Sequence, residues 1–252
     1  MRFVTFNLRC DHGQDGNNCF VFRQPLILEA IAENQPDVMC FQEVLPHMAK
    51  WLKDSLPEYY VVGCGRGERL DSEQMTIAIR RDRYDLLEMH TYWLSDTPEV
   101  PGSLYPGQSD NPRICTEAIL MEEGSGQLYR VVNTHLDHVG AEARRRGLLQ
   151  ILGTVPRVEA FAQAPMILAG DFNAQPEDPE MAPLFEDPSL RVITTDVGFT
   201  YHGYGKAERP SLIDYIVLRG ALSCEKVWKW TTERNGVYLS DHYPVCCDLS
   251  HR

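Results

Sequence analysis

The chain has 252 residues, of which 43% are hydrophobic and 24% are charged, a composition typical of a soluble globular protein. Its formal net charge of −12 disfavours binding to duplex nucleic acid, because proteins that bind it carry a basic surface. No apolar run approaches the roughly 20 residues that span a bilayer, so we expect no membrane insertion. One domain over residues 1–252 fits this length.

The N-terminal sequence, MRFVTFNLRC, runs directly into an alternating strand pattern and resembles neither a signal peptide nor a transit peptide. The eight cysteines show no CxxC or Cys/His zinc spacing. Several lie in apolar runs, where a thiol packs as a small hydrophobe, and the adjacent Cys246 and Cys247 should point to opposite faces of a strand. We therefore expect reduced thiols in a cytoplasmic protein; export of a longer precursor would permit a disulfide.

Short apolar or alternating runs, bounded by Gly, Pro, Asp or Asn, recur along the whole chain and indicate β-strands. The predicted strands are RFVTFNL, DVMCFQEV, YYVVGCG, MTIAIRR, ICTEAILME, LYRVVNTHL, MILAGDFN, LIDYIVL, EKVWKWTT and VCCDLS.

Fewer segments have helical periodicity. We predict helices over residues 22–34, 46–56 and 179–185, and a helical segment over residues 141–164 that Gly153 and Pro156 should break or kink. Residues 95–112, which contain four prolines, should form a long loop. Many strands with few helices predict a layered α/β or α+β domain, in which two sheets pack face to face and helices cover their outer faces.

Carboxylate, amide and imidazole side chains recur where the predicted strands end. For one such residue a turn or capping role is the simpler explanation, but five strand termini share this chemistry. In open α/β sheets the ligand binds at the carboxyl ends of the strands. The residues concerned are Asn7, Glu43, His135 with Asp137, Asp171 with Asn173, and Asp241 with His242.

Hard oxygen ligands without a cysteine–histidine cluster favour Mg²⁺, with Mn²⁺ or Ca²⁺ as alternatives. Glu43 is the first candidate ligand, followed by Asn7 and Asp241. The chain has no GxxxxGK[ST] phosphate loop and no GxSxG nucleophile motif. Direct attack by an activated water is therefore the simplest mechanism.

The motifs TFNLR, FQEV, NTHLDH, GDFN, IDYI and SDH follow one another between residues 5 and 242. In this order they resemble the endonuclease/exonuclease/phosphatase superfamily, and YWLSDTPEVPGS with TYHGYG is similar to a bacterial branch of poorly assigned function. The resemblance implies a four-layered α/β/β/α sandwich and Mg²⁺-dependent cleavage of phosphodiesters or phosphomonoesters.

The resemblance also implies roles for individual residues. Asn7 and Glu43 match metal-site positions, Asp241 matches a carboxylate that binds metal or orients water, and His135 matches a histidine that contacts the phosphate. Asp171 and Asn173 match the pair around the attacking water and the scissile phosphate, and Asp214 matches the carboxylate that orients His242.

The chemistry of the side chains agrees with these roles. Asp171 is a natural base or orienting group for water, and Asn173 donates to a phosphoryl oxygen without adding negative charge. His242, hydrogen-bonded to Asp214, would stay protonated and stabilise a charged transition state. Glu73 either pairs with His135 in the same way or is a surface charge at a strand end.

Phosphate affinity in so acidic a chain requires local cations. Arg113 is the first candidate, because it precedes a strand whose neighbours carry the site, and Arg66 and Arg9 follow. His202 either reaches the substrate or is a loop histidine bonded to backbone.

These features predict a metal-dependent phosphodiesterase that acts on a small or single-stranded phosphate ester, with no obligate protein partner. A phosphomonoesterase acting on a sugar or inositol phosphate is the alternative within the same chemistry. A catalytically inactive binding module that keeps the fold is the alternative from another class.

Overall fold

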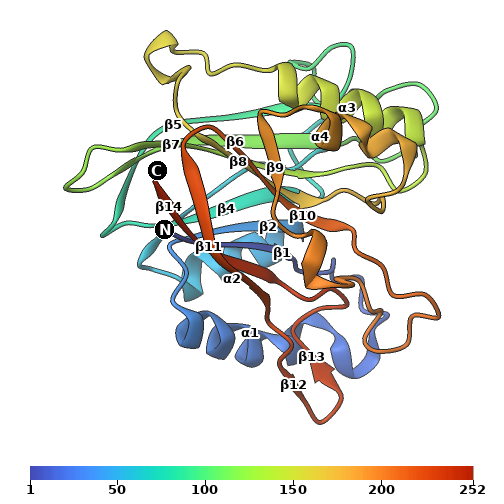
Figure 1. Ribbon diagram of the computed structural model, residues 1–252. Coiled ribbons are helices and arrows are strands. Elements are labelled where there is room, and N and C mark those ends of the chain that lie inside the picture. Colours follow the sequence, from blue (N-terminus) through green and yellow to red (C-terminus); the bar gives the residue numbers. More distant parts are fainter. Residues whose placement is uncertain (252) are drawn as a thin grey trace.

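The computed structural model describes residues 1–251, and in this part of the chain two six-stranded β-sheets form the centre of the molecule (Figure 1). The strand order of the first sheet is β11-β14-β1-β2-β4-β3. Its strands are β1 (Arg2–Asn7), β2 (Val38–Val44), β3 (Tyr59–Val62), β4 (Gln74–Arg80), β11 (Leu222–Lys229) and β14 (Val245–His251).

The strand order of the second sheet is β5-β6-β7-β8-β10-β9. Its strands are β5 (Tyr84–Trp93), β6 (Ile114–Glu122), β7 (Leu128–His135), β8 (Met166–Asp171), β9 (Leu190–Val192) and β10 (Asp214–Arg219). A separate hairpin pairs β12 (Glu233–Arg234) with β13 (Val237–Tyr238).

Helices cover the outer faces of both sheets (Figure 1). The first sheet carries α1 (Phe20–Asn34) and α2 (Pro46–Ser55), and the second carries α3 (Ala141–Gly153) and α4 (Ala182–Glu186). Short 3-10 turns occur at Gly16–Asn18, Glu159–Phe161, Pro179–Met181 and Thr195–Val197. This arrangement confirms the predicted four-layered sandwich. Within residues 1–251 no helix has the length and hydropathy needed to cross a bilayer.

The apolar pattern of each element explains these layers. Ile27, Ala30 and Ile31 form one buried face of α1, which packs on Phe6 and Phe41 of the first sheet. Such spacing at i, i+3 and i+4 places the three side chains on one side of a helix. The helix ends before Gln35, which has a left-handed backbone with φ 47°.

Strand alternation separates the core between the two sheets from the cores beneath the helices. In β1, Phe3 faces the second sheet, whereas Val4 faces the helices. Cys246 and Cys247 also lie in opposite cores, as predicted, and the eight cysteines are free thiols.

The predicted elements agree with the structure in most places. The helical segment breaks after Gly153, and residues 95–112 form a loop without helix or strand. The sequence-based prediction missed β5, β9, β12 and β13. The β5 strand lies at the edge of its sheet, where Leu87 and Met89 are exposed and a register shift falls between Leu86 and Glu88, so the simple alternation of a strand is blurred.

The sheet registers bring distant parts of the chain to one edge. The pairs β1–β2 and β7–β8 are parallel, so their carboxyl ends coincide. His135 is the register partner of Asp171, and Asp171 is in turn the partner of Asp214. Between the sheets, the buried amide of Gln42 donates to Asn133 at 2.7 Å. The strand ends of both sheets therefore meet in one place.

Candidate active site

The polar residues at these strand ends converge on one cleft with a volume of about 620 Å³. Asn7 and Asp214 support its wall, because Asn7 donates to Glu43 and Asp171, and Asp214 bonds to His242. The predicted site residues that line the cleft are Arg9, Glu43, Arg66, Glu73, Arg113, His135, Asp171, Asn173, Asp241 and His242.

Asn7 connects acidic residues of the two sheets. Its Nδ2 donates to Glu43 Oε1 and to Asp171 Oδ2, each at 2.9 Å, and Glu43 Oε2 accepts from the backbone N–H of Cys10 at 2.8 Å. Burial opposes the charge on Glu43, but these two hydrogen bonds and the positive charge of His242 outweigh burial and lower its pKa. Glu43 is therefore ionised and held in one orientation.

Three residues of the cleft wall have a left-handed backbone, which non-glycine residues rarely adopt. Arg9, Glu43 and Asn173 have φ values of 58°, 60° and 51°. At Glu43 the pairing of β2 with β4 shifts register. Such conformations cost of order 1–3 kcal/mol each and cluster at functional sites. At these three positions the backbone therefore departs from the extended conformation of a strand.

His242 lies between two carboxylates. Its Nδ1 is 2.8 Å from Asp214 Oδ2, and its Nε2 is 3.8 Å from Asp171 Oδ2. Burial opposes the imidazolium, but the charges of Asp214, Asp171 and Asp241 outweigh burial and raise the pKa of His242. Burial and the charges of Asp214 and Glu43 raise the pKa of Asp171 to about 7, against the opposing effect of His242. A cationic imidazole thus faces a carboxyl group that exchanges its proton near neutral pH.

His135 has the opposite charge preference. Burial, together with the positive charges of Arg113 and Arg66, lowers its pKa. Asn173 Nδ2 lies 2.8 Å from His135 Nε2, and an amide donor there implies that Nε2 accepts and that Nδ1 carries the proton. Within residues 1–251 that buried Nδ1 has no hydrogen-bond partner. The site therefore holds one neutral and one charged imidazole.

The predicted pairing of Glu73 with His135 is wrong, and so is the alternative of a surface charge. Glu73 is buried, and its Oε1 accepts from Arg66 Nη2 at 2.9 Å. The Arg66 backbone N–H also donates to the Glu73 carbonyl oxygen at 2.9 Å. The loop after β3 thus places the Arg66 guanidinium next to the Glu73 carboxylate.

Arg113 and Arg66 are buried cations in the cleft wall. Arg113 Nε donates to Asp137 at 3.3 Å, and Arg66 Nη2 donates to Glu73 and Asn111. In the described residues, Arg113 Nη1 and both Nε and Nη1 of Arg66 have no acceptor. Unpaired buried donors are costly. Because both arginines line the cleft, an anion bound there would accept hydrogen bonds from them and relieve that cost.

Arg9 is more exposed than the other two arginines. Its Nε lies 3.2 Å from Asp15 Oδ2 and 3.8 Å from Asp241 Oδ2. Asp15 therefore holds Arg9 beside the predicted metal ligand Asp241.

Of the two alternatives for His202, the structure supports the loop histidine bonded to backbone. Its ring stacks on Tyr243 with centroids 3.9 Å apart, its Nδ1 accepts from the Gly205 N–H at 3.1 Å, and only 2% of the residue is exposed. Burial lowers the pKa of His202 to about 4. The neighbouring Tyr201 lines the cleft instead.

Sequence reasoning did not single out several residues that build the site. Cys10 lines the cleft, and the buried amides of Gln42 and Asn133 join the two sheets beneath it. The signal for the amides was present, because a buried polar side chain within an apolar strand requires a partner. Cys10 carried no comparable signal.

Asp137 anchors the long loop and Arg113 together. Its carboxylate accepts from the backbone N–H groups of Ser109 and Gly140 at 3.1 and 2.8 Å, besides the bond from Arg113. Burial opposes its charge, but hydrogen bonds from the Ser109 hydroxyl and from the N–H groups of Gly140, Ser109 and Val139 lower the pKa of Asp137. Its bonds from the Val139 and Gly140 N–H groups are the local side-chain–backbone bonds typical of an aspartate in a turn, here just before α3.

The acidic residues fit a hard divalent cation. Glu43, His135 and Asp171 each present a ligand atom within 4.8 Å of the others, and burial with the charge of Glu43 raises the pKa of Asp241. Crowded buried carboxylates repel one another, and a divalent cation between them would relieve that repulsion. Oxygen donors from carboxylates and the Asn7 amide suit Mg²⁺, Mn²⁺ or Ca²⁺.

The fold is a four-layered sandwich whose sheet edges bring carboxylates, amides and imidazoles together in one cleft. The chain belongs to the endonuclease/exonuclease/phosphatase family, whose sequence profile matches residues 4–242. This match confirms the resemblance inferred from the motifs.

Two solved structures and one curated relative are similar to this chain over most of its length. An endonuclease/exonuclease/phosphatase from Bacteroides vulgatus has a TM-score of 0.92 and 28% identity, covering 100% of this chain and 98% of that one. A mannosyl-6-phosphatase from Bacteroides thetaiotaomicron has a TM-score of 0.86 and 27% identity, covering 99% of each chain. An uncharacterised protein of Acanthamoeba polyphaga mimivirus is 28% identical over 242 residues, which cover 88% of this chain and 89% of the relative.

Proposed function

We propose that the protein is a divalent-metal-dependent phosphoesterase that cleaves its ester by direct attack of water. The observation that carries this proposal is the buried group formed by His242, Asp214 and Asp171 beside Glu43. It combines a cation, a group that exchanges a proton near neutral pH, and an ionised carboxylate, which are the components that phosphoryl transfer to water requires.

Glu43, Asn7 and Asp241 would hold the metal, with Mg²⁺ as the first candidate. A bound divalent cation polarises the phosphoryl oxygens and neutralises developing charge. The chain supports this role by keeping Glu43 ionised and by fixing Asn7 through its bonds to Glu43 and Asp171.

The attacking water is oriented by Asp171. A pKa of about 7 lets its carboxylate accept a proton at neutral pH. His242, kept cationic by Asp214, stabilises negative charge on the phosphoryl group. Asn173 Nδ2 already donates to His135 and to the Leu136 carbonyl oxygen. A contact from Asn173 to the phosphate therefore replaces one of these two bonds.

The cleft favours a small substrate. Its volume of about 620 Å³ lies within the range of small-molecule pockets. Arg66 and Arg113 offer unpaired donors that suit the two charges of a terminal phosphate. We therefore place a phosphomonoester ahead of the diester expected from the sequence, and the 27% identity to a mannosyl-6-phosphatase supports this order.

The experiment that tests the function compares initial rates with Mg²⁺ or Mn²⁺ on four substrates. These are p-nitrophenyl phosphate, its bis ester, mannose 6-phosphate and a single-stranded oligonucleotide. We expect the two monoesters to be cleaved fastest, with His242→Ala as the control for contaminating activity. Faster cleavage of the diester or the oligonucleotide would reverse the order of substrates. No turnover on any of the four would favour the inactive binding module.

A further inference from the structure

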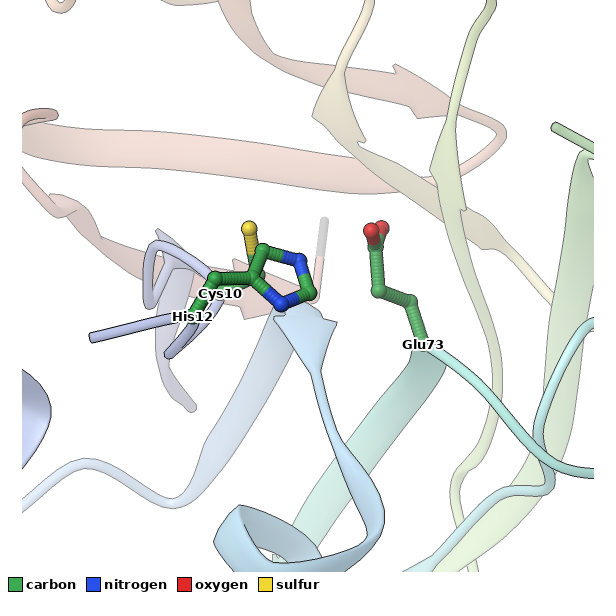
Figure 2. A group of neighbouring side chains, drawn as sticks. All are labelled: Cys10, His12 and Glu73. Atoms are coloured by element: carbon green, nitrogen blue, oxygen red, sulfur yellow. The ribbon is translucent and has the colours of Figure 1, made fainter. Parts of the chain in front are cut away.

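Cys10, His12 and Glu73 form a second group of metal-ligating side chains at the edge of the cleft. Figure 2 shows the thiol and the imidazole, on the segment after β1, facing the carboxylate of Glu73, which lies just before β4. One ligand atom from each residue lies within 4.8 Å of the other two. Because Cys10 and Glu73 line the cleft and His12 is exposed, solvent ions can reach the group.

Carboxylates lie close to the thiol of this group. The charges of Glu43 and Glu73 act on the Cys10 sulfur, against the opposing charge of Arg9. Arg66 occupies only one oxygen of Glu73, namely Oε1. Glu73 is 9% exposed, and within residues 1–251 the hydrogen bond from Arg66 goes to Oε1 and not to Oε2. Oε2 is therefore available to a metal ion.

The donor set determines the kind of cation. Sulfur and imidazole nitrogen are soft or borderline ligands that Mg²⁺ does not favour, whereas Zn²⁺ takes cysteine, histidine and carboxylate together. We propose that Cys10, His12 and Glu73 bind a thiophilic divalent cation of the Zn²⁺ class, at a site separate from the hard-cation site of Glu43, Asn7 and Asp241. This site is independent of the proposed phosphoesterase activity.

A cation at this site would have one coordination position left for a ligand from the cleft. Zinc sites with three protein ligands keep a fourth position for water or substrate. Since Cys10 and Glu73 line the cleft, that fourth position opens toward it, next to the guanidinium of Arg66. Binding releases the thiol proton of Cys10 to solvent, because only the thiolate is a metal ligand. An anion in the cleft would then complete the coordination.

The test uses Co²⁺ as a spectroscopic probe for Zn²⁺, in the presence of excess Mg²⁺ to fill the hard-cation site. A cobalt–thiolate bond produces a charge-transfer absorption that oxygen and nitrogen ligands alone do not produce. We expect this absorption in the unaltered protein, its removal by one equivalent of Zn²⁺, and its persistence in Asp241→Asn. That last result separates the site from the phosphoesterase machinery, because Asp241 belongs to the proposed hard-cation site and is not one of the three ligands proposed here.

Variants of the ligands decide the assignment. Cys10→Ser should abolish the absorption, whereas Cys224→Ser, which changes a partly exposed thiol on β11, should leave it intact. His12→Gln alters an exposed loop residue and so spares the fold. It should weaken Co²⁺ binding by roughly ten- to a hundredfold or more. The proposal is overturned by a missing absorption in the unaltered protein, by its persistence in Cys10→Ser, or by unchanged Co²⁺ affinity in His12→Gln.

Discussion

Replacing Asp214 by asparagine removes the negative charge that lies 2.8 Å from His242 Nδ1, while the size of the side chain stays nearly the same. A hydrogen bond to a charged group contributes roughly 1.5–3 kcal/mol. Since about 1.4 kcal/mol corresponds to tenfold in rate, Asp214→Asn should lower kcat by roughly ten- to 150-fold. The change in KM should be smaller, because the charge matters mainly in the transition state.

Removing the imidazole itself should cost more. His242→Ala deletes the cation that faces Asp171 at 3.8 Å, and losing one such electrostatic partner costs on the order of 10²–10³ in rate. Asp214 acts through His242, so the double variant should be little slower than His242→Ala alone. The assay is kcat and KM for the unaltered protein, both single variants and the double variant at saturating metal, with circular dichroism to check folding.

The pH profile separates this role from a merely structural one. Asp214 raises the pKa of His242, so its removal disfavours the imidazolium. Activity that needs the charged form is lost as pH rises through that pKa, and in Asp214→Asn this loss should begin at a lower pH. Additive losses in the double variant, or an unshifted alkaline limb, would refute the pairing.

Three further predictions concern residues that shape the site. Asp137→Asn should lower the free energy of unfolding by about 2–4 kcal/mol at pH 7, because its carboxylate accepts several hydrogen bonds. The pKa of Asp137 is lowered in the folded protein, so its contribution to the free energy of unfolding is present above the ordinary aspartate pKa and is lost as pH falls through the folded value. In urea unfolding, the stability difference between Asp137→Asn and the unaltered protein should therefore shrink in acid. A difference that stays constant with pH would contradict this. Arg23→Leu should destabilise the fold by at least about 3 kcal/mol in the same assay, because Arg23 is fully buried and donates to four carbonyl oxygens, including those of Leu8 and Leu239. A change below about 1 kcal/mol would show that these bonds contribute little. Arg113→Lys should lower kcat/KM roughly tenfold or more for a monoester and less for a diester, because lysine lacks the planar guanidinium that binds two phosphate oxygens at once. Equal losses on both substrates would show that Arg113 does not recognise the terminal phosphate.

Much of the fold, and the gathering of most candidate site residues in one cleft, could be predicted because the determinants are local. Asn7, Glu43, His135 and Asp171 each lie at the end of an apolar strand, and the carboxyl ends of parallel neighbours must meet. The Asp214–His242 contact was expected from the family resemblance, and the register of Asp214 with Asp171 explains it.

The errors arose where several tertiary partners compete for one side chain. Glu73 could bond to His135 or to Arg66, and only the path of the loop after β3 decides for Arg66. For His202 the sequence left two alternatives open, and the bond from Gly205 with the stacking on Tyr243 decides for the histidine bonded to backbone. The group of Cys10, His12 and Glu73 joins residues more than 60 positions apart, a separation that no local spacing rule covers.

The central claim, hydrolysis that depends on a hard divalent cation held by Glu43, is tested most directly by a metal titration of activity. After exhaustive chelation the protein should be inactive on its best phosphate ester, and Mg²⁺ should restore full activity. In Glu43→Gln the Mg²⁺ concentration needed for half-maximal activity should rise by roughly ten- to a hundredfold or more. Full activity without added metal, or an unchanged Mg²⁺ titration in Glu43→Gln, would contradict the account.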